Sequence, residues 1–174
     1  MIKRMIAGSM VMLAAVAATP VAAADAYPSK PVRIIVPFPP GGAADIMTRA
    51  LGERMRKQLG QPIVIENKPG AGTVIASDYV AKQAPDGYTL LMAASSLGIA
   101  PSIYKNVNYD PVRDFAPITL VASVVHVLEV NAAVPVHSVK DLIAYMKTSG
   151  KALSYSSAGT GTSTHLEAEL FKSM

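Results

Sequence analysis

The sequence predicts an α/β fold built on a parallel sheet, and three observations support this. A short, nearly continuous apolar run at residues 32–36 is typical of a strand that is buried on both faces. Over residues 43–58 apolar side chains then recur every four positions, as they do on one face of a helix. The same order of strand and helix repeats, so residues 32–93 predict a β-α-β-α-β unit with short loops. Such a unit is one half of a doubly wound domain.

The elements of this unit follow from local signals. The first helix carries its apolar stripe on Met47, Leu51, Met55 and Leu59, and Gly60 is a stop signal after its last turn. The remaining elements are expected in this order: a strand at 62–66, a turn at 69–72, a helix at 73–84, a turn at 85–87 and a strand at 88–93.

A second unit begins near residue 118, after a helix expected at 97–104 and a Pro-rich stretch at 109–117. In this unit we expect, in order, a β-rich segment at 118–130, a helix opened by a capping box at Ser138 and Asp141, a strand at 152–156 and a helix at 164–174. We therefore divide the chain into a first domain at 27–117 and an incomplete second domain at 118–174. The second unit is too short to close a core well, so we expect the front part of a longer protein.

Residues 1–26 predict a cleaved signal peptide. Two basic residues precede an apolar run at residues 6–18, which is too short for a membrane span of about 20 residues. Two A-x-A patterns place the cleavage after Ala24 or Ala26. The sequence thus predicts export to the periplasm.

Composition excludes several classes of protein. The 16 Lys+Arg and 12 Asp+Glu residues leave a net charge of only +4, without a basic run, which does not favour nucleic acid as a partner. The absence of cysteine excludes disulfides, Cys-ligated zinc, a thiol nucleophile and a lipoprotein anchor. No HExxH motif or carboxylate cluster suggests a metal, and we expect no cofactor.

Three loops each follow a strand, contain Gly or Ser, and precede a helix. They lie at residues 39–45, 95–98 and 157–165. Helix N-termini present unpaired N–H groups, and glycine lets an anion approach the backbone closely. In open α/β sheets ligands bind at the carboxyl ends of the strands. The loops therefore favour a small anion, although a plain N-cap turn is the alternative for each.

The more specific phosphate-binding, dinucleotide-binding and hydrolase motifs are incomplete in these loops. No Lys follows the glycines, as a phosphate-binding P-loop requires, and the third glycine of a dinucleotide-binding fingerprint is missing. Residues 161–165 lack the last glycine of a serine-hydrolase elbow, and Ser163 and His165 do not obviously face each other. A small α/β hydrolase using Ser163 remains an alternative. Asp45 is interpreted as a cap or hydrogen-bond acceptor rather than a general base.

Five motifs follow one another along the chain: YPSKPVRIIVPFPPGGAAD at 27–45, QPIVIENKPGAG at 61–72, APDGYTL at 84–90, YDPVRDFAP at 109–117 and SAGTGTSTHL at 157–166. In this order they resemble the extracytoplasmic receptors of tripartite tricarboxylate transporters, the Bug family. The resemblance implies a periplasmic-binding-protein-like Venus flytrap with two domains, truncated here. It also implies a receptor without catalytic activity that passes a small organic acid to membrane permease subunits.

The resemblance implies a binding site as well. Receptors of this family hold a carboxylate between two loops, and a third loop lines the cleft. The matching positions here are Gly41, Gly42, Asp45, Ser95, Ser96, Gly161, Ser163, Thr164 and His165. Gly42 is expected to need a positive φ or a close backbone approach to the ligand. A receptor that signals to a membrane sensor kinase is an alternative role, and the identity of the carboxylate is not readable.

Overall fold

The computed structural model describes residues 26–150 and 153–174. Its elements are β1 (Val32–Val36), α1 (Ala43–Leu59), β2 (Ile63–Asn67), the short 3-10 helix η1 (Ala71–Thr73), α2 (Val74–Ala81), β3 (Thr89–Leu91), α3 (Ser96–Ile103), α4 (Val139–Thr148) and α5 (Ser163–Ser173). All but the last residue of the predicted signal peptide lies outside the described residues. Among the helices that are described, none is long and apolar enough to cross a membrane.

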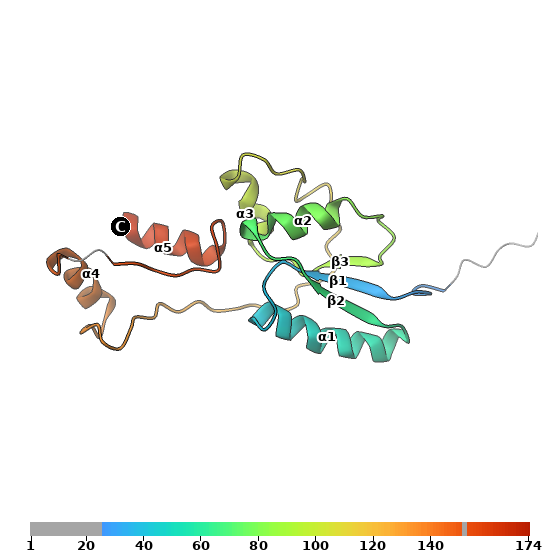
Figure 1. Ribbon diagram of the computed structural model, residues 1–174, viewed down its shortest axis with the longest axis horizontal. Helices are drawn as coiled ribbons and strands as arrows, with labels where there is room; N and C mark the ends of the chain where they lie inside the picture. The colour runs from blue at the N-terminus through green and yellow to red at the C-terminus, as the bar shows by residue number, and fades with distance from the viewer. Residues whose placement is uncertain (1–25, 151–152) are drawn as a thin grey trace, which may run out of the picture.

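The sheet is parallel, with the strand order β2-β1-β3. β1 is central, and Val32, Ile35 and Val36 are completely buried in it. Helix α1 covers one face of the sheet, while α2 and α3 lie over the other (Figure 1). This arrangement explains why the sequence of β1 is nearly all apolar: a central parallel strand is covered on both faces. The predicted parallel sheet is therefore confirmed.

Helix α1 packs closely on β2 at a glycine. A Cβ at Gly52 would lie 3.1 Å from Ile65 Cδ1 and 3.2 Å from Ile63 Cγ2, which is tighter than ordinary contact. The helix ends at Gly60, whose φ of 67° is left-handed and whose N–H donates to the Arg56 carbonyl oxygen at 3.0 Å. The stop predicted at Gly60 is thus confirmed.

Valine at Gly52 is expected to destabilise the fold by about 1–3 kcal/mol, because its methyl groups must push β2 away from α1. The same change at Gly98 in α3 is the control, since a Cβ there meets no atom within 4 Å. Chemical denaturation of the two variants measures the difference. An equal free energy of unfolding for both would contradict the close packing at Gly52.

Some predicted boundaries differ from the structure. The helix expected at 73–84 covers only Val74–Ala81. It begins after Thr73 because the φ of this residue, 82°, is left-handed and breaks the right-handed helical path. The strand expected in the β-rich segment 118–130 does not form, and neither do residues 153–156 form a strand. A strand needs a neighbour for its backbone hydrogen bonds, and the described sheet contains only β1, β2 and β3.

The C-terminal elements lie to one side of the sheet. Figure 1 shows α4 and α5 beside the sheet part of the molecule, by which we mean β1 to α3 with their connecting loops. The capping box that opens α4 is confirmed, since Ser138 Oγ accepts the Asp141 N–H at 3.1 Å. His126 in the β-rich segment 118–130 contacts Glu167 on α5, with 2.7 Å between His126 Nδ1 and Glu167 Oε1. This contact joins the segment to the last helix.

Candidate functional site

The candidate site lies at the carboxyl edge of the sheet. β1 ends in the first loop (residues 37–42) before α1, β2 ends in the middle loop (68–73) before α2, and β3 is followed by residues 92–95 before α3. Because the strands are parallel, all three connections meet at one edge, where ligands bind in open α/β sheets. The last loop (157–162), which precedes α5, reaches the same place.

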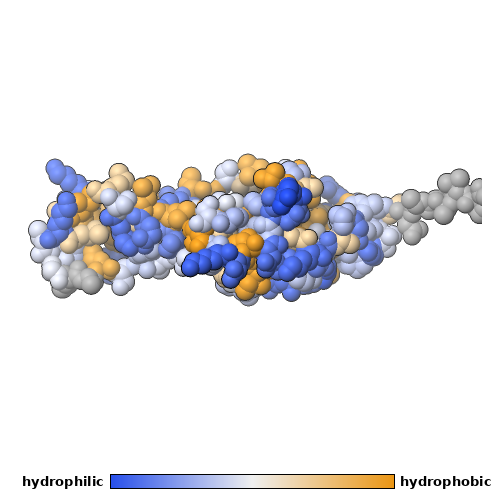
Figure 2. Space-filling model, turned by 90° about the horizontal axis from the view of Figure 1, so that it is seen from above, coloured by the Kyte–Doolittle hydropathy of each residue, from blue (hydrophilic) through white to orange (hydrophobic). Residues whose placement is uncertain are grey.

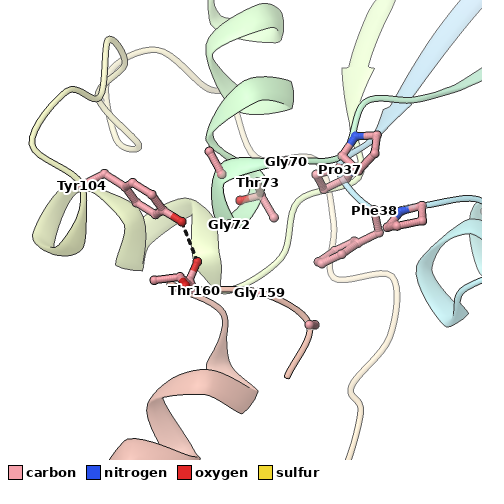
Figure 3. Close-up of a pocket in the computed structure, with 12 residues that line it drawn as sticks. Pro37, Phe38, Gly70, Gly72, Thr73, Tyr104, Gly159 and Thr160 are labelled. Carbon is pink, nitrogen blue, oxygen red and sulfur yellow. Dashed lines mark hydrogen bonds between the residues drawn. The ribbon is translucent and has the colours of Figure 1, made fainter. Parts of the chain in front are cut away.

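A cavity of about 390 Å³ opens between these loops. Its walls come from the first, middle and last loops and from the residue after α3. They are Pro37, Phe38, Pro39, Pro69, Gly70, Ala71, Gly72, Thr73, Tyr104, Ala158, Gly159 and Thr160. Figure 3 shows Pro37 and Phe38 on one side, with Tyr104, Gly159 and Thr160 on the other. The first and last loops, both expected from the sequence to contribute to the site, therefore face each other across one cavity.

The buried Asp45 carboxylate holds the first loop through hydrogen bonds. Its Oδ2 accepts the Gly41 N–H at 2.9 Å and Arg49 Nε at 3.0 Å, and its Oδ1 accepts Asn67 Nδ2 at 2.9 Å. The same amide nitrogen also donates to the Phe38 carbonyl oxygen at 3.0 Å. Asp45 is only 3% exposed. The interpretation of Asp45 as a hydrogen-bond acceptor agrees with these contacts, which use the carboxylate to hold the loop.

These partners also lower the pKa of Asp45. The Arg49 guanidinium contributes most, followed by the Gly41 N–H and the Asn67 amide, and together they hold the pKa of this carboxyl well below its usual range. A group whose folded pKa is depressed adds stability above its unfolded pKa of about 3.9, and this stability is lost as the pH falls toward the folded pKa.

Acidification is therefore expected to destabilise the protein partly through Asp45. Melting temperatures measured from about pH 6 down to about pH 2 should fall more steeply for the wild-type chain than for Asp45→Asn once the pH drops below about 4. The variant has no carboxyl to protonate at this position. Parallel curves for the two proteins would show that Asp45 does not contribute to the acid sensitivity.

The left-handed backbone in the first loop belongs to Gly41 rather than Gly42. Gly41 has a φ of 84°, whereas Gly42 has φ −76° and ψ 167°. Of the two alternatives expected for Gly42, the positive φ is wrong, because Gly42 is the N-cap of α1 and this position takes an extended conformation. The close backbone approach to a ligand stays a prediction. A Cβ at Gly42 would make only an ordinary contact, 3.7 Å from the Pro39 carbonyl oxygen.

The two serines predicted for the third loop differ in burial. Ser95 is exposed and precedes the first residue of α3. Ser96 is 1% exposed, and its Oγ accepts the Thr73 hydroxyl at 2.9 Å. Thr73 lines the cavity, while the two serines are not among the cavity residues. Ser96 thus holds the start of α3 against η1 and supports the wall from behind.

The last loop is braced by its own hydroxyl groups. Thr162 Oγ1 donates to the Gly159 carbonyl oxygen at 2.6 Å, and Thr164 Oγ1 accepts the Ala158 N–H at 3.2 Å. Gly161 is buried with a φ of 83°. These bonds shape the turn that presents residues 158–160 to the cavity.

Ser163 and His165 begin α5 behind this turn. Both are partly buried, and no hydrogen bond joins them within the described part of the chain. His165 Nδ1 is buried without a hydrogen-bond partner among the described residues. Buried polar atoms are normally hydrogen-bonded, so this nitrogen is expected to have a partner such as a water. A ligand contact of His165 stays a prediction, since His165 does not line the cavity. The described residues also contain no group of three or more His, Cys, Asp or Glu side chains that could hold a metal ion.

Sequence reasoning missed part of the cavity wall. The pattern at residues 69–72 is interpreted above as a turn only, although PGAG follows a strand and precedes a helix just as the other three loops do. The criterion used for the other loops, a Gly- or Ser-containing loop between a strand and a helix, also selects residues 69–72. Tyr104 gives no such signal, because a single aromatic residue after a short helix has no pattern that points to a site.

Comparison with known proteins places the chain in a family. The family described as "Tripartite tricarboxylate transporter family receptor" matches residues 47–174. The chain belongs to this receptor family. The resemblance inferred from the five sequence motifs is therefore confirmed.

Two relatives of this receptor come from Bordetella pertussis. A UPF0065 protein of this organism is 42% identical over 153 residues, which cover 86% of this chain and 46% of the relative. Protein BugT is 41% identical over 157 residues, covering 89% of this chain and 48% of BugT. The chain spans about half the length of the curated relatives it matches.

Solved structures agree with the family. "R. palustris Rpa4515 with adipate" has a TM-score of 0.80 at 37% identity, over 85% of this chain and 50% of that one. "Structure of periplasmic binding protein BugD" has a TM-score of 0.71 at 36% identity, over 84% and 50%. The receptor family is thus one of solute-binding proteins, and the predicted α/β periplasmic-binding-protein fold is confirmed. The domain boundary at residues 117 and 118 stays a prediction.

Proposed function

We propose that this chain forms the ligand-binding edge of a periplasmic receptor that captures a small carboxylate. The observation that carries the proposal is the cavity itself, where the first and last loops face each other at the carboxyl edge of a parallel sheet. The adipate named in the R. palustris structure, which has a TM-score of 0.80 with this chain, supports a carboxylate as the ligand class. The protein has no catalytic step in this proposal.

The chemistry of the walls suits an anion held by backbone groups. The described residues that line the cavity include no Asp or Glu to repel a carboxylate, and no Lys, Arg or His to neutralise it. α1 follows the first loop and α5 follows the last loop, so two helix N-termini flank the cavity. Their unpaired N–H groups and positive dipole ends stabilise negative charge. Gly42 is the N-cap of α1, and Ser163, Thr164 and His165 form the first turn of α5. None of the nine positions predicted from the sequence lines the cavity itself, so in this proposal they shape the loops and helix termini beside it.

We also propose how the receptor acts in the cell. A signal peptide at 1–26 would be cleaved on export, and the loaded receptor would pass its carboxylate to the membrane permease subunits of a tripartite transporter. The family match supports this role. Because the relatives are about twice as long, we propose that firm binding also needs the second half that they carry.

A fusion tests this proposal directly. Residues 27–174 are joined to the C-terminal half of R. palustris Rpa4515, and calorimetry with adipate compares the fusion with the 174-residue chain. Saturable binding by the fusion, with little or none by the chain alone, is expected. A fusion that folds but binds none of a panel of mono-, di- and tricarboxylates would overturn the proposal.

Gly41→Val in the fusion is expected to weaken adipate binding by about tenfold to a hundredfold, the value of one charge-assisted hydrogen bond. Valine cannot easily keep the φ of 84° that shapes the first loop. Gly60→Val is the matched control, since Gly60 has a φ of 67° and equally open surroundings but lies at the far end of α1. Equal affinities of the two variants would exclude the first loop from the site.

A further inference from the structure

A tyrosine joins the last loop to the sheet part of the molecule. Tyr104 follows the last residue of α3, and its hydroxyl donates to the Thr160 carbonyl oxygen at 2.8 Å. The two residues are 56 positions apart in the sequence. Figure 3 shows the Tyr104 ring extending toward Thr160 along one wall of the cavity, with this hydrogen bond dashed. The bond therefore ties together two walls that come from separate parts of the chain.

Two glycines make room for this contact. A Cβ at Gly72 would overlap the Thr160 carbonyl oxygen and would lie 2.9 Å from the Tyr104 hydroxyl oxygen. A Cβ at Gly161 would lie 3.0 Å from Tyr104 Cε2. Because the first obstacle is a backbone oxygen, it cannot rotate away as a flexible side chain would. The middle and last loops thus meet backbone against backbone, with the tyrosine ring packed beside them.

We propose that Tyr104 is a positioning residue that latches the last loop to the sheet part of the molecule before any ligand arrives. The latch consists of Tyr104, Thr160 and Gly72, and it sets the distance between two walls of the cavity. The contacts that define it are all made between groups of the protein, so the walls are held together by the protein alone. The consequence for the ligand rests on the proposed function, whereas the latch itself does not.

Hydrogen exchange of the ligand-free 174-residue chain, in dilute solution, tests the latch. Tyr104→Phe removes only the hydroxyl, and the amides of the last loop are expected to exchange about twofold to tenfold faster, as for the loss of one neutral hydrogen bond. Thr162 is a suitable reporter, because its N–H donates to the Gly159 carbonyl oxygen at 3.1 Å. The β1 amides serve as the internal reference.

Tyr109→Phe is the matched control for a merely structural effect. The Tyr109 hydroxyl also donates to a backbone carbonyl oxygen, that of Leu97 at 3.2 Å, but this bond involves no residue of the last loop. We expect this variant to leave exchange of the last loop unchanged. If Tyr104→Phe and Tyr109→Phe change the exchange of the last loop equally, the latch proposal is overturned.

A second pair of variants approaches the latch from the other wall. Gly72→Ala adds a Cβ against Thr160, whereas Gly60→Ala adds one at a similar φ with no atom within 4 Å. The backbone strain is the same in kind, so the difference between them reports the collision alone. Faster exchange of the last loop is expected only for Gly72→Ala, and its absence would contradict the close approach.

The ligand consequence is measured separately in the fusion with the second half of Rpa4515. There, Tyr104→Phe is expected to weaken adipate binding by about twofold to tenfold, mainly through faster dissociation. Unchanged dissociation beside faster loop exchange would overturn the positioning role. A fusion that binds no carboxylate at all would count against the proposed function, while exchange in the ligand-free chain would still decide whether the latch exists.

Discussion

Asp45→Ala is expected to lower the melting temperature by several degrees and to release the first loop from the sheet. The buried carboxylate accepts hydrogen bonds from Gly41, Arg49 and Asn67, and alanine leaves all three donors without this acceptor. Two of the donors are attached to elements that the loop must stay against, since Arg49 is on α1 and Asn67 ends β2. The acceptor is buried and charged, and hydrogen bonds to a charged group are stronger than neutral ones, so losing this acceptor is costly. Thermal melting monitored by circular dichroism measures the loss.

Glu53→Ala is the matched control on the same helix. Glu53 pairs with Arg56 at 2.7 Å, a distance as short as those around Asp45, but both side chains of this pair are more than half exposed. Exposed ion pairs contribute little to stability, so this change should leave the melting temperature nearly unaltered. Equal losses for the Asp45 and Glu53 variants would show that burial of Asp45 has no special consequence.

Self-association of the 174-residue chain is the second large effect that we expect. The apolar segment (residues 118–130) leaves many large side chains in solvent: Ile118, Leu120, Val121, Val124, Val125, Val127, Leu128 and Val130. Figure 2 shows apolar residues at the surface of the sheet part and of the C-terminal part that holds α4 and α5. Full burial of one such side chain stabilises by about 1.5–3 kcal/mol, so several together favour association at roughly micromolar concentrations.

Sedimentation velocity over a range of concentrations measures this association. The double variant Leu120→Lys/Val125→Lys, which changes side chains that are 80% and 87% exposed, should remain monomeric. Val112→Lys is the control, because Val112 is 83% exposed but lies outside the apolar segment. A monomeric wild-type chain throughout the range would contradict the prediction. In the fusion the segment should be covered, and association should weaken.

Local patterns were sufficient for most of the sheet part. The apolar run of β1, the four-residue period of α1 and its glycine stop all depend on residues that are close in sequence, and each lies where it is expected. The capping box of α4 is equally local. Such signals are read correctly without the rest of the chain, because backbone propensity and capping act within a few residues.

The apolar segment (residues 118–130) shows where prediction from local patterns fails. Its β-branched residues favour an extended backbone, and the backbone from 118 to 130 is indeed not helical. A strand, however, is defined by hydrogen bonds to a neighbour, and among the described residues the sheet pairs only β1, β2 and β3. Propensity therefore predicts the local conformation of a β-rich segment, while pairing depends on what else the chain brings near it.

The sequence by itself determined the α/β class, the order of the elements along the sheet part and the position of the glycine-rich loops at its carboxyl edge. Only the tertiary structure decided how those loops are held. It buried Asp45 between Arg49 and Asn67, assigned the left-handed backbone to Gly41, and brought Tyr104 to Thr160. The physical reason is separation along the chain: propensities and caps act over a few residues, whereas the Tyr104 contact spans 56 and exists only once the path of the folded chain is set.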